Sequence, residues 1–379
     1  MEWFLLVFAV FWLAWANGAN DNFKGVATLY GCKAMDYRSA LWLATASTLA
    51  GSFLSIVLAG ALVMTFSGKG LVPDELVGSR ELLIAVGGGA GLTVLFATIL
   101  GMPTSTTHAL TGAHGGIALV VGGGRADLSR LWSDFATPLL VSPLLAIGGA
   151  AILYLIFRKT RLALGINRTT CICIGSKAVA SGTAVAAGTA LAGDKALTAV
   201  PLTTVPTLVI GENDECVERY DGHVAGISAQ KIVDGTHMFS GAAVCFARAV
   251  NDTPKITALL LATGAWAAGW KLAFVAVVMA VAGLVQARKV AETMSHRITD
   301  LNPGQGLTAN LVTAGLVLVA SGYGMPVSTT HVSCGSIFGI GIASRSVKWK
   351  TAAQIAATWL TTLPMGALFG AGLYWFLAH

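Results

Sequence analysis

The sequence predicts an all-α polytopic membrane protein with an inverted-repeat plan, broken helices, two re-entrant helical hairpins and a partly β extramembrane insertion. Three observations predict it: the composition, the lengths of the apolar runs and a duplication within the chain. Of 379 residues, 55% are hydrophobic and 11% charged, and the mean hydropathy is +0.73. A soluble domain carries about 25% charged residues. This chain therefore has too little polar surface for water, but it can face lipid.

Apolar runs long enough to cross a bilayer recur along the chain, since a spanning helix needs roughly 20 apolar residues. They occupy 2–34, 39–64, 81–122, 135–157, 231–265, 270–287, 305–343 and 352–377. Polar or helix-breaking residues are expected to interrupt the runs 2–34, 81–122, 231–265 and 305–343. The first run lacks a basic leader and continues directly into a polar motif, so we expect a retained helix and not a cleaved signal peptide.

The stretch 158–230 differs in composition and predicts a division into 1–157, a first membrane repeat, 158–230, an insertion, and 231–379, a second, inverted repeat. The insertion opens with basic residues and is rich in Thr, Val, Ala and Gly. It is expected to be partly β and cytoplasmic. Its cysteines are Cys171, Cys173 and Cys216, and their spacing matches no standard zinc pattern. We expect packed, reduced thiols, with a metal or regulatory site as the alternative.

Two short motifs recur in the same order in both halves. Residues 101–108 (GMPTSTTH) match 324–331 (GMPVSTTH) except at one position, and Asn20-Asp21 with Lys24 match Asn251-Asp252 with Lys255. Basic clusters at 33–38, 158–168, 288–297 and 345–350 favour the cytoplasmic side. That placement makes 81–122 a hairpin from the outer face and 305–343 one from the inner face. The copies then have opposite orientations, as in secondary transporters.

The paired acidic motifs predict a cation site. Ionisable residues within apolar runs are costly to insert and are functional candidates by default. Asp21 and Asp252 each follow an asparagine, and carboxylate and amide oxygens suit a hard cation such as Na⁺. The predicted coupling-cation residues are Asn20, Asp21, Asn251 and Asp252. The alternative is an aspartate that merely caps a broken helix.

The duplicated Pro-x-Ser-Thr-Thr-His motifs predict an anion site. A proline stops one helix, and the Ser or Thr after it can cap the next. The new helix start directs free N–H groups and partial positive charge into the break. The predicted anion-binding hydroxyls are Ser105, Thr106, Thr107, Ser328, Thr329 and Thr330. The alternative is a simple proline kink, and for His108 and His331 a packing role is as well supported as an orienting one.

These motifs resemble those of the inorganic phosphate transporter (PiT) family, of which this chain looks like a divergent member of bacterial or archaeal type. The resemblance rests on Gly18-Ala19-Asn20-Asp21, its partner Asn251-Asp252 and the duplicated Pro-x-Ser-Thr-Thr-His. It implies uptake of inorganic phosphate by alternating access, coupled to Na⁺ or H⁺, through an inverted-repeat fold with two hairpins. It also implies the cation and anion roles assigned above, in a multi-pass protein of the cell (inner) membrane.

The chain departs from the family pattern at the cation site. Where the family motif Gly-Ala-Asn-Asp-Val-Ala-Asn ends in asparagine, this sequence has Lys24 and Lys255, and Asn310 stands where relatives commonly carry a glutamate. We add both lysines to the expected anion site. The hypothesis is that each one either replaces a sodium ion or contacts the oxyanion directly. The alternative is that both extend to the membrane interface.

Other classes of function fit less well. Sulfate or another tetrahedral oxyanion suits the same donors and is the runner-up cargo. The sequence has no His-Glu-x-x-His motif and no Gly-x-Ser-x-Gly elbow in a suitable context, so we expect no enzyme, no bound metal and no cofactor beyond the coupling ion. A channel would not transport solute against a gradient. The net charge of +6 falls in short clusters, which indicates topology and not nucleic-acid binding. A homodimer is compatible with this plan.

Overall fold

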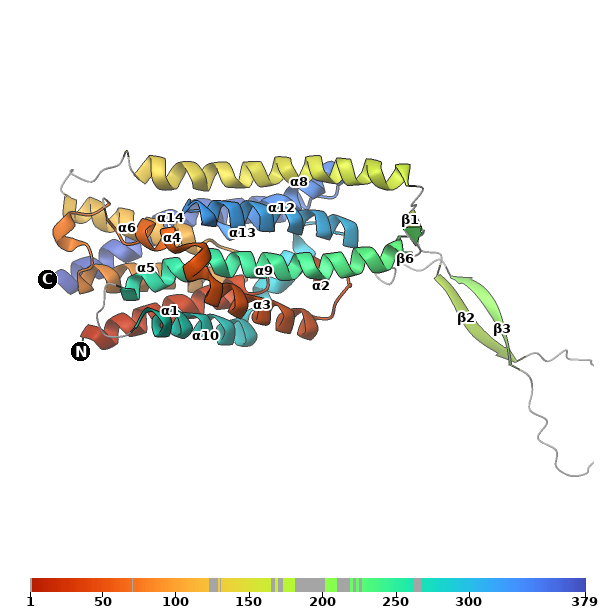
Figure 1. Ribbon diagram of the computed structural model, residues 1–379, viewed down its shortest axis with the longest axis horizontal. Helices are drawn as coiled ribbons and strands as arrows, with labels where there is room; N and C mark the ends of the chain where they lie inside the picture. The colour runs from red at the N-terminus through yellow and green to blue at the C-terminus, as the bar shows by residue number, and fades with distance from the viewer. Residues whose placement is uncertain are drawn as a thin grey trace, which may run out of the picture. The chain divides into compact units, whose positions relative to one another are not determined.

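The computed structural model describes residues 2–69, 71–122, 129, 131–164, 168–169, 173–180, 202–209, 219–220, 223–224, 227–261 and 267–379. The chain separates into two compact units. One comprises Met1–Gly165 with Lys231–His379, and the other is Ile166–Gln230. The first unit is a bundle of helices that lie side by side, with both termini at the same end (Figure 1).

The first half of the bundle runs from α1 to α8. Its elements are α1 (Glu2–Asp21), α2 (Ala27–Gly31), α3 (Tyr37–Leu58), α4 (Gly60–Thr65), η1 (Asp74–Leu76), α5 (Arg80–Ile99), α6 (Thr106–Gly122), a π-helical turn η2 (Leu131–Ala136) and α8 (Thr137–Ala163). Asp36 caps α3 by accepting hydrogen bonds from the N–H groups of Ser39 and Arg38, at 3.1 and 2.9 Å. Hydrogen bonds from Ser39, foremost that of its side chain, hold the pKa of this exposed carboxyl below its ordinary value.

The second half runs from α9 to α14. Its elements are α9 (Ala229–Leu261), α10 (Ala268–Gln286), α11 (Arg288–Glu292), a π-helical turn η3 (Thr293–Arg297), α12 (Pro303–Gly322), α13 (Thr329–Ser344) and α14 (Trp349–Ala378). Within the part of the chain that the structure describes, six helices are long and apolar enough to span a membrane: Trp3–Asp21, Arg80–Ile99, Leu131–Ala163, Ala268–Gln286, Pro303–Gly322 and Trp349–Ala378.

The predicted interruptions are present in three of the four runs and absent from the described residues of the fourth. Turns separate α1 from α2, α5 from α6, and α12 from α13. For the described residues 231–261 the expected break is wrong, because α9 continues through Asn251, Asp252 and Pro254 to Leu261. A proline removes one backbone donor and crowds the preceding turn. In α9 the residues next to Pro254, Thr253 and Lys255, are buried, and this packing outweighs the local preference for a break.

The last long helix of each half packs on the broken helices of the other half. α14 packs against α5 and α6, and α8 packs against α12 and α13. Small residues permit this approach: a Cβ on Gly116 would lie 2.3 Å from the carbonyl oxygen of Ala367, and one on Gly339 would lie 2.2 Å from that of Ile147. On their other faces α8 and α14 expose large apolar side chains such as Leu144, with 66% of its surface exposed. Such surfaces suit lipid.

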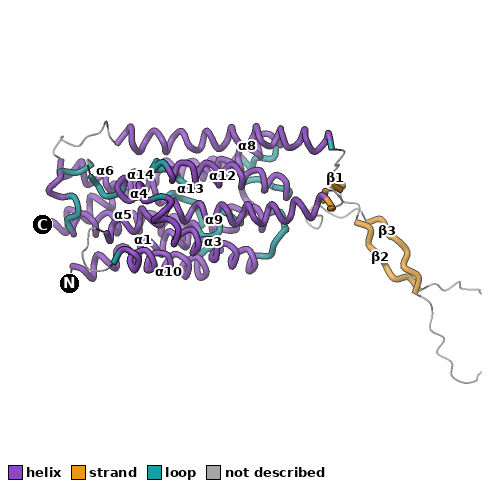
Figure 2. Tube along the Cα trace, viewed as in Figure 1, coloured by secondary structure: helices purple, strands orange, loops and turns teal. Residues whose placement is uncertain are grey.

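The second unit contains short antiparallel strand pairs within its described residues (Figure 2). β2 (Cys173–Ala180) pairs with β3 (Leu202–Val209), β1 (Arg168–Thr169) with β4 (Arg219–Tyr220), and β5 (His223–Val224) with β6 (Ile227–Ser228). Cys173 is the first residue of β2. Cys171 and Cys216 lie outside the described residues.

Candidate functional site

The first half-helix of each break ends at a glycine. Gly101 and Gly324 have φ of 69° and 68°, the left-handed conformation that glycine adopts at little cost. The N–H of Met102 then donates to the carbonyl of Ala97, and that of Met325 donates to Ala320, both at 2.9 Å. This is the Schellman termination of a helix. The proline was expected to end the first half-helix, but the glycine two residues earlier ends it.

A serine starts the second half-helix of each break, as predicted. The N–H of His108 donates to Ser105 Oγ at 3.1 Å, and the N–H of His331 donates to Ser328 Oγ at 3.1 Å. The side chains of these serines therefore cap α6 and α13. The first N–H groups of a helix have no partner within it and carry partial positive charge. Each break thus presents a helix N-terminus.

The two breaks contact each other in equivalent ways. Thr107 Oγ1 donates to the carbonyl of Val327 at 3.1 Å, and Thr330 Oγ1 donates to the carbonyl of Thr104. At the next residue of each break, the imidazole rings of His108 and His331 lie 4.2 Å apart, centroid to centroid. His108 Nδ1 is 3.0 Å from Ser105 Oγ. The two histidines therefore pack against each other at the junction, and His108 also contacts Ser105, the serine that caps α6.

One asparagine joins both carboxylates to the first break. Asn17 Nδ2 lies 3.3 Å from Asp21 Oδ2, 3.2 Å from Asp252 Oδ2 and 2.9 Å from Thr106 Oγ1. All four side chains are buried. The acidic motifs and the Ser/Thr motifs, far apart in sequence, thus form one cluster in the centre of the bundle.

Asn20 and Asn251 hold the broken segments of their own halves. Asn20 accepts from the N–H of Thr104 at 3.0 Å and donates to Thr98 Oγ1 at 2.9 Å. Asn251 donates to the carbonyl of Val327 at 3.2 Å and accepts from Ser321 Oγ at 3.1 Å. Their amide groups therefore fix the backbone on which the adjacent hydroxyls stand.

Both lysines of the motif are buried in this cluster. Lys24 is 2% exposed and Lys255 is 0% exposed. Each contacts the aspartate three residues before it. The alternative that they extend to the membrane interface is therefore wrong.

Arg248 is a further buried member that the sequence argument missed. Its Nη1 donates to Asn17 Oδ1 at 3.1 Å and lies 4.0 Å from Asp252 Oδ2, and its Nη2 donates to Thr48 Oγ1 at 2.7 Å. Its Nε has no partner. An arginine within an apolar run, four residues before Asp252 on the same helix, is a signal that the rule for intramembrane charges would have found.

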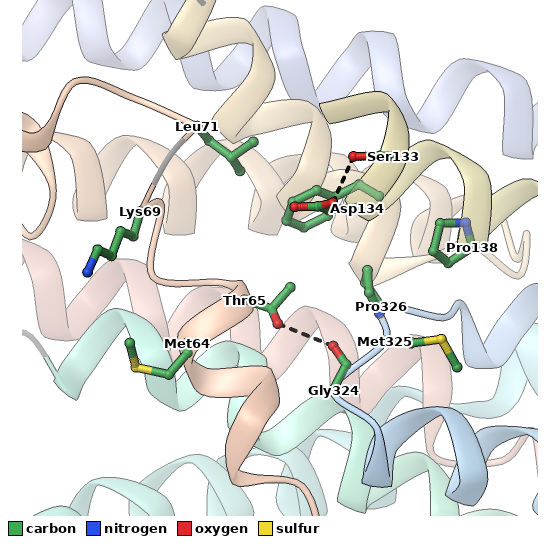
Figure 3. A pocket seen from close by; sticks show the side chains of 11 residues that line it. Met64, Thr65, Lys69, Leu71, Ser133, Asp134, Pro138, Gly324, Met325 and Pro326 are labelled. Atoms are coloured by element: carbon green, nitrogen blue, oxygen red, sulfur yellow. Dashed lines mark hydrogen bonds between the residues drawn. The ribbon is translucent and has the colours of Figure 1, made fainter. Parts of the chain in front are cut away.

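A cavity of about 610 Å³ reaches the second break (Figure 3). Its lining includes Thr65, Lys69, Phe135 and the segment Gly324–Pro326. Phe135 packs edge-on against Phe66, and Lys255 Nζ lies 5.5 Å from the Phe66 ring centroid. Phe66 therefore contacts both a residue of the cavity lining and a buried ammonium group.

A model of the phosphate transporter family matches residues 17–370, which is nearly the whole chain. The chain belongs to the phosphate transporter family. An inorganic phosphate transporter 2-1 of Arabidopsis chloroplasts is 28% identical over 96% of this chain and 70% of the relative. A protein of Pyrococcus horikoshii named as a phosphate permease is 25% identical over 97% and 95%.

A solved structure, that of a sodium-dependent phosphate transporter, has the same fold. It matches with a TM-score of 0.73 at 20% identity, over 100% of this chain and 99% of that one. Family membership and the six apolar helices make the chain a multi-pass membrane protein. Among the described residues, no group of three His, Cys, Asp or Glu side chains is placed to hold a metal ion.

Proposed function

We propose that the chain is a secondary active transporter that takes up inorganic phosphate across the cell membrane, coupled to Na⁺ or H⁺. One observation carries the proposal: the charge of the buried cluster. Lys24, Arg248 and Lys255 stand against Asp21 and Asp252. In their ordinary charge states these five side chains carry one excess positive charge. A buried charge without a counter-ion is costly, and one monovalent anion neutralises it.

The donors for that anion come from both breaks. The anion-binding groups we propose are the N-termini of α6 and α13, the guanidinium of Arg248, and the hydroxyls of Ser105, Thr106, Thr107, Ser328, Thr329 and Thr330. A tetrahedral oxyanion needs convergent donors, and helix N-termini supply them without a net charge of their own. Asn20, Asp21, Asn251 and Asp252 form the proposed cation site beside them.

The proposed transport cycle is alternating access between oppositely inserted repeats. The equivalent contacts of Thr107 and Thr330 across the junction support a two-fold relation between the breaks. α5 packs on α6 and α12 on α13, which supports the two hairpins as re-entrant units. The cavity at Gly324–Pro326 is the proposed access route from one side of the membrane. The insertion 158–230 is proposed to be extramembrane and cytoplasmic, and a homodimer is compatible with the exposed apolar faces.

Sulfate is the second candidate because of how the carboxylates are engaged. Phosphate can donate a hydrogen bond near neutral pH, whereas sulfate cannot, so a site selective for phosphate benefits from an acceptor. Asp21 is bonded to Lys24 and Asn17, and Asp252 to Asn251 and Asn17. The charge of the cluster favours phosphate. A monovalent phosphate neutralises the one excess positive charge, whereas a divalent sulfate would overcompensate it.

The test is uptake of labelled phosphate into proteoliposomes, with sulfate as competitor. Phosphate should accumulate and unlabelled phosphate should compete better than sulfate. Thr107→Val and Thr330→Val should each reduce uptake. A matched control is Thr361→Val, an exposed threonine whose hydroxyl bonds only within α14, to Ala357 and Thr358. Absence of phosphate uptake by folded protein, or stronger competition by sulfate, would overturn the assignment of cargo.

A further inference from the structure

Lys24 and Lys255 occupy equivalent positions in the two halves. Lys24 Nζ donates to Asp21 Oδ1, to Thr330 Oγ1 and, at 2.9 Å, to the carbonyl of Thr104. Each ammonium thus contacts the carboxylate of its own half, a backbone carbonyl of its own break and a hydroxyl of the opposite half.

The contacts of Lys255 repeat this set. Its Nζ lies 2.7 Å from Thr107 Oγ1, 3.1 Å from the carbonyl of Val327 and 3.6 Å from Asp252 Oδ1. By position in the repeat, Thr107 corresponds to Thr330, and Val327 to Thr104. A chance ion pair would not reproduce all three partners in both halves.

The oxygens around each ammonium are of the kind that binds a hard cation. Carboxylate, backbone carbonyl and hydroxyl oxygens are the ligands that such ions take in proteins. In the breaks of transporter helices, free carbonyls serve the same purpose. An ammonium has three N–H donors, and in Lys24 three oxygens engage them. No donor of Lys24 remains for an oxyanion in this arrangement.

We propose that Lys24 and Lys255 are covalently attached counter-cations that permanently fill two cation positions, so that phosphate transport by this chain does not require Na⁺. This inference rests on the proposed function and removes one of its two coupling ions. A second cation about 4 Å from an ammonium would bind on the order of a thousandfold more weakly, at the effective dielectric constant that reproduces measured pairs. The carboxylates also keep their partners when no free cation is present.

The first measurement compares Na⁺ with choline on the wild-type protein. Phosphate uptake into proteoliposomes should be equal in the two salts at fixed pH. The unfolding temperature of the purified protein should also show no saturable increase with Na⁺, because a ligand that binds the folded state stabilises it. Uptake that falls about tenfold or more in choline, or a saturable Na⁺ stabilisation, would overturn the proposal.

The second measurement removes the attached cations. Lys24→Asn/Lys255→Asn leaves two carboxylates in oxygen-lined sites, so it should become less stable in choline and regain stability in Na⁺. The matched control, Lys350→Asn, changes an exposed lysine and should respond like wild type. A folded double variant that gains no Na⁺ response shows that these are not cation positions. If the double variant does not fold, the wild-type comparison and the single variants decide.

These readouts separate the two proposals. The stability measurement needs no transport, so it tests the attached cations even if phosphate is not the cargo. Conversely, Na⁺-dependent phosphate uptake would uphold the proposed function and refute the attached cations.

Discussion

Replacing Arg248 by glutamine should weaken phosphate binding. The change removes the one excess positive charge of the cluster and a guanidinium whose Nε has no protein partner. A hydrogen bond to a charged group contributes about 1.5–3 kcal/mol. At 1.4 kcal/mol per factor of ten, the KM for phosphate should rise roughly 10- to 150-fold. Arg248→Lys keeps the charge but loses the planar guanidinium, so its KM should lie between those of the wild type and the glutamine variant.

The assay is the concentration dependence of labelled phosphate uptake in proteoliposomes, with the unfolding temperature measured on the same preparations. The second readout is needed because Arg248 also bonds to Asn17 and Thr48 and lies 4.0 Å from Asp252. Removing one member of a buried ion pair typically costs 3–5 kcal/mol of stability. A folded glutamine variant with a KM within about threefold of wild type would refute the role, since less than 1 kcal/mol would then be involved.

Three further changes test the breaks and the topology. Gly324→Ala should destabilise the protein by roughly 2–4 kcal/mol in chemical unfolding, because it forces a left-handed conformation and puts a Cβ 2.8 Å from that of Ala61; an unchanged stability contradicts the assigned strain. Ser328→Ala should cost about 1 kcal/mol through loss of the cap, and Ser328→Gly less, which the same unfolding experiment checks. Cysteines placed at Glu75 and Lys350 should react with an impermeant reagent from opposite sides of the membrane, and labelling from one side would refute the inverted insertion.

Local chemistry made much of the site predictable. The Pro-x-Ser-Thr-Thr motif determines where a helix can restart, and Ser105 and Ser328 cap their helices as expected. The acidic pairs were predictable because buried carboxylates are costly and these two occupy equivalent places in a repeat. Capping depends only on residues within one turn of the chain, and the repeat can be recognised by comparing the two halves of the sequence.

Partners that meet across the bundle were not predictable in the same way. Nothing local to Lys24 shows that Thr330 will be its acceptor, because that contact depends on how the two halves pack. The course of α9 through Pro254 also depends on packing, which outweighed the local preference for a break. Arg248 was missed for another reason: it has no counterpart in the repeat, where Asn17 stands at the equivalent position.

Each buried lysine donates to a threonine hydroxyl of the opposite half, and this has a consequence for biogenesis. During translation the segment with Lys24 is made long before Thr330, its acceptor in the finished protein. The first half must therefore enter the translocon while the Lys24 ammonium lacks one of its hydrogen-bond partners. That hydrogen bond can form only after residues 328–331 have been synthesised. Chains truncated before that point should be retained by insertion chaperones or degraded, however well their own helices are formed.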